Sequence, residues 1–127
     1  MDEKFEIIKN KLITNEFEKN FEYDVKKVEY LDGIYIVLLD IPNDCNEIDN
    51  IFGVDISGRA IWRIENPSIS FPTEKTGNPE FDNLTESVYV GLIVNQEKEI
   101  YAVTFWGIKY KFNYKTGKLI KKEVSRW

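Results

Sequence analysis

Residues 34–39 read Ile-Tyr-Ile-Val-Leu-Leu, the longest uninterrupted apolar run in the chain. β-Branched and aromatic residues are enriched in strands, so this run predicts a strand. Six residues are far fewer than the roughly 18 that a membrane-spanning helix needs. An alternating apolar stretch at 21–30 lies before this run, and Asp32-Gly33 separates the two. Because Asp-Gly favours a type I′ turn, with positive φ at both central positions, the sequence predicts a β-hairpin that ends before Pro42.

Further hairpins are predicted on both sides of this one. Residues 51–54 and 60–64 flank a turn in which Gly58 can adopt the left-handed conformation. Strand-like runs also occur at 11–14, 88–94, 100–105, 108–114 and 118–124. The N-terminal segment is ambiguous, because apolar residues also recur there at helical spacing, at Met1, Phe5, Ile8 and Leu12.

The spacing of these runs predicts a mostly-β chain, an antiparallel meander of about eight short strands packed as a sandwich or a partly propeller-like sheet, with a short N-terminal helix as an open alternative. A length of 127 residues suits one domain over residues 1–127. Within it, residues 65–87 hold three of the four prolines and show no sustained period, which predicts a long loop.

Composition narrows the possible functions. The chain has no histidine, which removes Ser-His-Asp and Cys-His catalysis and most zinc chemistry. Its glycines are isolated, so no phosphate-binding loop is present, and we expect no cofactor and no enzymatic activity. A single cysteine, Cys45, and an acidic N-terminus without a signal-peptide pattern favour a cytoplasmic protein that neither spans nor binds a membrane.

The charge is uneven along the chain. The net charge is −5, yet residues 109–127 carry seven Lys or Arg and one Glu, which leaves −11 on residues 1–108. The basic segment 109–114, Lys-Tyr-Lys-Phe-Asn-Tyr, alternates polar and aromatic residues, as a half-buried strand does. We therefore expect a protein partner, basic in charge, rather than nucleic acid.

Two groups of residues are candidates for contact with that partner. The first is an acidic rim of Asp40, Asp44, Glu47 and Asp49, whose spacing does not match an EF-hand loop and which could equally be a solvated acidic loop. The second is Phe71 and Phe81 in the long loop, which could anchor an interface or fold back onto the core.

Three stretches together resemble a known group of proteins. They are Lys-Leu-Ile-Thr-Asn-Glu-Phe at 11–17, then Tyr-Ile-Val-Leu-Leu-Asp-Ile-Pro at 35–42 with 50–55 and Trp-Arg-Ile at 62–64, and last residues 101–110 with Thr-Gly-Lys at 116–118. The chain resembles small uncharacterised bacterial proteins, some of which look like immunity proteins of toxin systems.

The resemblance implies stoichiometric inhibition of a cognate toxin, with no chemistry required. In that case Asp40, Asp44, Glu47 and Asp49 would make polar contacts, while Phe71 and Phe81 would be apolar anchors. The alternatives are a self-associating structural or regulatory domain, of unknown oligomeric state, and, least favoured, a glycosidase that uses a pair of carboxylates.

Overall fold

The computed structural model describes residues 5–42, 49–66, 88–104 and 107–124. All regular elements in these ranges are β-strands, so the described residues contain no helix that could cross a membrane. Eleven strands are present there: β1 (Phe5–Ile8), β2 (Lys11–Thr14), β3 (Glu18–Asn20), β4 (Asp24–Leu31), β5 (Ile34–Asp40), β6 (Ile51–Asp55), β7 (Ala60–Arg63), β8 (Tyr89–Val94), β9 (Ile100–Thr104), β10 (Ile108–Phe112) and β11 (Leu119–Val124).

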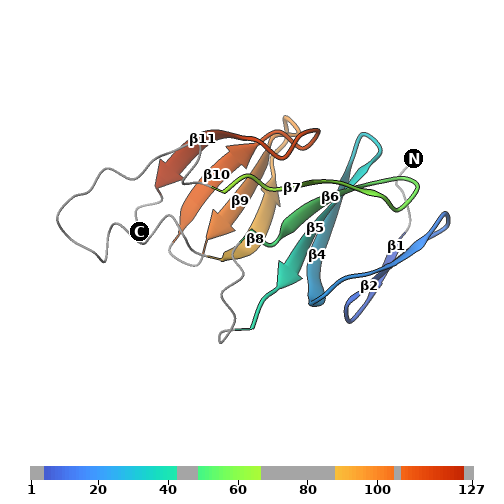
Figure 1. Cartoon of the computed structure of the whole chain (residues 1–127). Helices are drawn as coiled ribbons and strands as arrows, with labels where there is room; N and C mark the ends of the chain where they lie inside the picture. The colour runs from blue at the N-terminus through green and yellow to red at the C-terminus, as the bar shows by residue number, and fades with distance from the viewer. Residues whose placement is uncertain (1–4, 43–48, 67–87, 105–106, 125–127) are drawn as a thin grey trace.

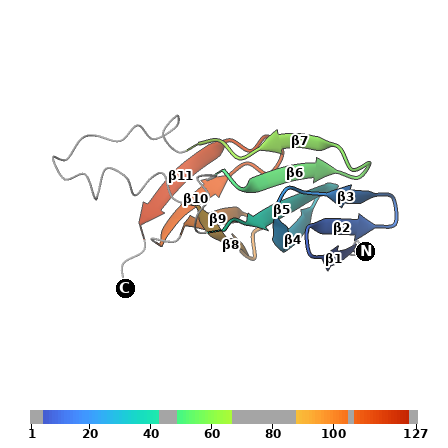
Figure 2. The ribbon, with the colours of Figure 1, turned by 60° about the horizontal axis from the view of Figure 1, so that its bottom comes forward.

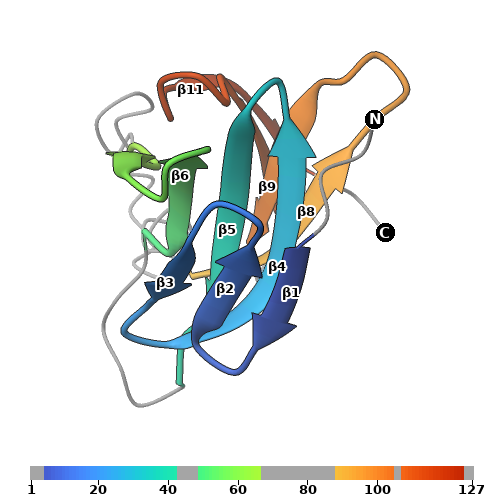
Figure 3. The same cartoon turned by 90° about the vertical axis from the view of Figure 1, so that its right-hand side faces the viewer.

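The strands form three antiparallel sheets. The N-terminal sheet has the order β1-β2-β3, the middle sheet β4-β5-β6-β7 and the C-terminal sheet β11-β10-β9-β8. Figure 1 shows the middle sheet between the other two, and Figure 3 shows the N-terminal sheet in front of β4 and β5, with β8 and β9 behind them. The strands of each sheet follow one another in chain order, as the predicted meander requires, and two four-stranded sheets do not close a propeller.

β5 is the strand that both outer sheets cover. Its residues Tyr35, Ile36, Val37, Leu38 and Leu39 are each at most 3% exposed. Successive strand residues point to opposite faces, so Ile36 and Leu38 pack in the cluster shared with the C-terminal sheet, whereas Tyr35, Val37 and Leu39 pack towards the N-terminal sheet. A strand buried on both faces requires a continuous apolar run, which residues 34–39 supply.

The two faces of the middle sheet carry separate hydrophobic clusters. One cluster joins it to the C-terminal sheet and consists of Ile36, Leu38, Ile51, Ile64, Tyr89, Leu92, Ile100, Ala102, Ile108, Tyr110, Phe112 and Leu119. The other lies towards the N-terminal sheet and consists of Leu12, Val25, Val28, Tyr35, Val37, Leu39 and Val54, with Phe5, Phe17 and Phe21 packed against it.

Polar contacts join the middle and C-terminal sheets along two edges. Lys27 of β4 donates from Nζ to the carbonyl oxygen of Leu92 in β8, at 2.8 Å. At the opposite edge, Trp62 of β7 donates from Nε1 to the carbonyl oxygen of Tyr114, also at 2.8 Å. Tyr114 belongs to the β10–β11 turn, which lies next to β7 in Figure 2.

The two predicted hairpin turns are confirmed. Asp32 and Gly33 have φ of 47° and 84°, as a type I′ turn requires, and Leu31 pairs with Ile34 across it. Gly58 has φ of 90° in the β6–β7 turn.

The N-terminal segment differs from the prediction. Residues 11–14 form a strand as expected, but the alternative of a helix at the N-terminus is wrong for the described part, where Phe5–Ile8 is β1. The count of about eight strands is too low mainly because β1 and β3 are only four and three residues long and mostly exposed, so neither shows a clear apolar alternation. Of the predicted loop 65–87, all but Glu65 and Asn66 lies outside the described residues.

Candidate functional site

Two of the six residues predicted to contact a partner lie in the described part of the chain. Asp40 is the last residue of β5 and is exposed, and Asp49 is half-buried just before β6. Because β5 and β6 are antiparallel and Leu38 pairs with Ile51, both aspartates lie at the same end of the middle sheet. Asp44, Glu47, Phe71 and Phe81 lie outside the described residues.

Asp40 lies directly opposite a second carboxylate. Its backbone partner in β4 is Asp24, and both side chains are exposed. A β-bulge creates this pairing, because the register shifts between Val25 and Lys27. Without that shift, the regular pairing that starts at the Asp32-Gly33 turn would place Asp24 opposite Ile41.

A hollow of about 300 Å³ surrounds this pair. We call it the acidic hollow, and Glu22, Tyr23, Asp24, Asp40 and Pro42 line it. In the described part of the chain no Lys or Arg forms an ion pair with any of its three carboxylates. Like charges directly opposite each other destabilise a sheet, so among the described residues the negative charge of this hollow has no ion-pair partner.

A pocket of about 100 Å³ adjoins the acidic hollow and shares Glu22 and Tyr23 with it. Polar and apolar side chains both line it, and we call it the apolar pocket after the walls that Leu39, Ile41 and Phe21 form. Its remaining lining residues are Phe21, Leu39, Ile41, Asn50, Phe52 and Arg63. The Phe21 and Phe52 rings lie 6.3 Å apart between centroids. Arg63 places its guanidinium 5.3 Å from the centroid of Phe52, so this ring already has a cation of the chain itself beside it.

Asp49 has a different role from Asp40. Its carbonyl oxygen accepts a hydrogen bond from Arg63 Nε at 2.6 Å, and its carboxylate oxygens accept from Asn66 Nδ2 at 3.3 and 3.4 Å. It does not line the acidic hollow. The two described residues of the predicted acidic rim therefore have different roles. Asp40 lines the hollow, while the carbonyl oxygen of Asp49 holds Arg63 at the pocket.

Asn50 forms the buried wall of the pocket and is not one of the candidates predicted from the sequence. Only 1% of it is exposed. Its Nδ2 donates to the carbonyl oxygens of Leu39 and Tyr89, and its Oδ1 accepts from the Tyr89 amide. In the sequence it is one of several Asn residues in polar stretches, and its partner Tyr89 is 39 positions away, so no local pattern distinguishes it.

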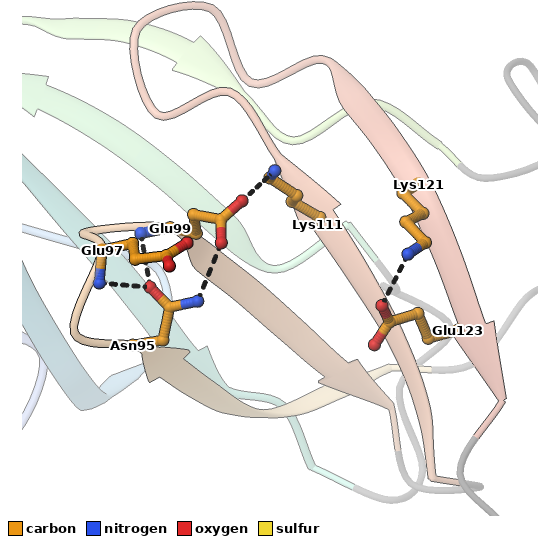
Figure 4. A network of polar contacts seen from close by, with 6 residues as sticks. All are labelled: Asn95, Glu97, Glu99, Lys111, Lys121 and Glu123. Carbon is orange, nitrogen blue, oxygen red and sulfur yellow. Dashed lines mark hydrogen bonds and ion pairs between the residues drawn. The ribbon is translucent and has the colours of Figure 1, made fainter.

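The outer face of the C-terminal sheet carries paired charges instead (Figure 4). Lys111 forms an ion pair with Glu99, to which Asn95 also donates at 3.0 Å, and Lys121 pairs with Glu123 at 3.1 Å. The hydrogen bonds from Lys111 and Asn95 lower the pKa of Glu99 to about 2. The predicted alternation in this segment is confirmed, since Tyr110 and Phe112 are buried, whereas Lys109 and Lys111, which alternate with them, are only half-buried.

The described ranges bring no three His, Cys, Asp or Glu side chains close enough together to hold a metal ion. Fold and site together define an all-β, antiparallel domain with an acidic hollow beside an apolar pocket. Residues 3–124 match the model of a domain of unknown function, DUF7957, and the chain belongs to this family. No curated protein and no solved structure matches the chain.

Proposed function

We propose that this chain is a non-catalytic, cytoplasmic protein-binding module, an immunity protein that neutralises a cognate bacterial toxin with a basic surface. The observation that carries the proposal is the cross-strand pair of Asp24 and Asp40 in the acidic hollow. Repulsion between the two carboxylates destabilises the folded chain when it is free, and a Lys or Arg side chain from a partner would offset that repulsion. The repulsion is therefore relieved in a complex.

The charge of the rest of the chain supports the same partner. Residues 1–108 carry a net charge of −11, and a field of one sign accelerates the encounter with an oppositely charged protein. The resemblance to small uncharacterised bacterial proteins, some of which look like immunity proteins, suggests a toxin whose active or entry site the domain covers. In this proposal Asp44 and Glu47 add polar contacts, and Phe71 and Phe81 supply apolar anchors at the interface.

The test is co-expression with the product of the adjacent reading frame. A product that is toxic alone and harmless with this chain, in a one-to-one complex, supports the proposal. Reversing both charges of the pair, Asp24→Lys with Asp40→Lys, should slow association by about tenfold or more at low salt and remove protection.

The matched control is Glu16→Lys with Glu18→Lys. It makes the same change in net charge around the β2–β3 turn, where Phe17 packs against Gly58 at the other end of the middle sheet. This control should still protect. Equal loss of protection in both double variants would mean that only net charge matters and that the acidic hollow is not the site.

Self-association is a second candidate function, favoured by a different observation. β1 is an edge strand of the N-terminal sheet, and its adjacent residues Ile7 and Ile8 are 38% and 54% exposed. Exposed apolar edge strands pair readily with other chains. Sedimentation that finds a dimer, lost on Ile8→Lys but not on Asp40→Lys, would favour this function over toxin binding.

Hydrolysis of glycosides is the least favoured function, although Asp24 and Asp40 form a carboxylate pair. A glycosidase needs one carboxyl group that a desolvated environment keeps protonated, and both of these side chains are exposed. If the protein hydrolyses chromogenic glycosides and Asp40→Asn abolishes this activity, glycoside hydrolysis becomes the favoured function.

A further inference from the structure

The apolar pocket next to the acidic hollow identifies the kind of partner segment that fits this end of the middle sheet. We infer that the pocket receives one aliphatic side chain of the partner protein, and that the residues on either side of this anchor in the partner are Lys or Arg. The inference rests on the proposed function and adds the chemistry of the contact.

The apolar walls of the pocket favour an aliphatic occupant. Leu39, Ile41 and Phe21 contribute apolar walls, and about 100 Å³ suits a branched aliphatic side chain but not a nucleotide or a flavin. A cation is disfavoured inside the pocket because Arg63 already lies over Phe52. An apolar side chain in the pocket removes apolar surface from water and is not repelled by the positive charge of Arg63.

The position of the acidic hollow selects the residues that flank the anchor. Glu22 and Tyr23 line both cavities, so an occupant of the pocket places its neighbours along the chain next to Asp24 and Asp40. These carboxylates have no basic partner in the described part of the chain. Charge complementarity therefore requires Lys or Arg next to the anchor.

The test uses the full chain and three acetylated, amidated tripeptides as probes: Arg-Leu-Arg, Arg-Ser-Arg and Glu-Leu-Glu. Binding is followed by NMR, with the methyl groups of Leu39 and Ile41 reporting on the pocket and the amides of Asp24 and Asp40 on the hollow. We expect Arg-Leu-Arg to move both sets of signals and to bind about tenfold more tightly than Arg-Ser-Arg. Glu-Leu-Glu should bind weakest.

The probes separate failure of this inference from failure of the proposed function. If both arginine peptides bind equally and move only the Asp24 and Asp40 amides, the aliphatic anchor is wrong and the acidic hollow stands. If Glu-Leu-Glu binds as well as Arg-Leu-Arg, the basic flanks are wrong and the proposed function loses its main support. If no peptide moves either set, this inference is overturned, while co-expression with the adjacent product still decides the proposed function.

A filled pocket gives an independent check. Ile41→Phe enlarges a half-buried lining residue and should remove the tenfold preference for leucine while leaving Arg-Ser-Arg binding unchanged. Ile120→Phe, at a position that is 55% exposed on β11, is the matched control and should keep the preference. A preference that survives Ile41→Phe in a variant with native-like amide spectra would place the anchor elsewhere and overturn the inference.

Discussion

The side chain of Asn50 pairs with the backbone of Tyr89 as a neighbouring strand would. Its Oδ1 accepts from the Tyr89 amide at 3.0 Å and its Nδ2 donates to the Tyr89 carbonyl oxygen at 2.9 Å. The same Nδ2 donates to the carbonyl oxygen of Leu39 at 2.7 Å. One buried amide therefore joins β5, the start of β6 and the first residue of β8.

Removing this amide should destabilise the protein strongly. Asn50→Ala leaves buried backbone groups of Tyr89 and Leu39 without these partners, and we expect a loss of about 3 kcal/mol in the free energy of unfolding. Urea unfolding should show a lower midpoint with an unchanged m-value. The control Asn20→Ala, on exposed β3, should change stability by less than about 0.5 kcal/mol. Equal midpoints for the two variants would contradict the role assigned to Asn50.

Two strand glycines should respond differently to alanine. A Cβ at Gly53 would lie 2.1 Å from Cε2 of Trp62, so Gly53→Ala must displace the indole and its hydrogen bond to Tyr114. We expect a loss of about 1–3 kcal/mol and a shift in tryptophan fluorescence. A Cβ at Gly91 meets Val103 at an ordinary 3.7 Å, so Gly91→Ala should be neutral or stabilise by about 0.5 kcal/mol. Thermal unfolding of both variants measures the contrast.

The turn between β8 and β9 contains a strained lysine. The Asn95 amide donates to the Glu99 carbonyl oxygen, and the Lys98 amide donates to that of Asn95. The β6–β7 turn has the same two hydrogen bonds, from the Asp55 amide to Arg59 and from the Gly58 amide to Asp55, and Gly58 adopts the left-handed conformation there. Lys98 occupies the equivalent position with φ of 61°. Lys98→Gly should therefore stabilise the protein by about 1 kcal/mol. Lys98→Ala keeps the strain and is the control, so equal gains in both variants would point to the lost charge instead.

The ion pair between Glu99 and Lys111 should make stability depend on acid pH. The pKa of Glu99 falls from 4.5 to about 2 on folding. A lowered folded pKa means that the contribution is complete above pH 4.5 and is lost as the pH falls towards 2. In a double-mutant cycle of Glu99→Gln and Lys111→Met, the coupling energy should be complete at pH 7 and largely lost at pH 2, where Glu99 is about half protonated in the folded protein. A coupling energy that does not change with pH would contradict this assignment.

Relieving the acidic pair should stabilise the free protein. Asp40→Lys places a positive charge opposite Asp24 in the β4–β5 pair, and we expect a gain of about 0.5 kcal/mol in the free energy of unfolding. The double variant Asp24→Lys with Asp40→Lys restores a like-charged pair and should lose that gain. Urea unfolding at low salt measures both. A single variant less stable than the wild type would mean that the two aspartates do not repel each other in the folded state.

Local turn chemistry explains which parts of the fold the sequence predicts correctly. Asp32, Gly33 and Gly58 determine their turns through their own backbone preferences, so both hairpins follow from neighbouring residues. The apolar run 34–39 likewise predicts a strand. It does not reveal that two different sheets cover β5, because this depends on residues distant in the chain.

The candidate site was predictable only in part for the same reason. Asp40 stands out as an acid at the end of a strand, but its partner Asp24 depends on a bulge that shifts the register by one residue. A regular hairpin counted from Asp32-Gly33 would miss the pair. Asn50 depends on Tyr89 in another sheet, and no local pattern specifies a contact of that kind.

The burial of β5 on both faces determines how the chain must unfold. Each hydrophobic cluster includes side chains of this strand, so detaching either outer sheet exposes one face of β5 to water. Partial opening is therefore costly on both sides, and the two clusters should melt cooperatively. The β5 amides are then expected to exchange with solvent only through global opening, which makes their exchange rates a direct measure of the stability of the whole chain.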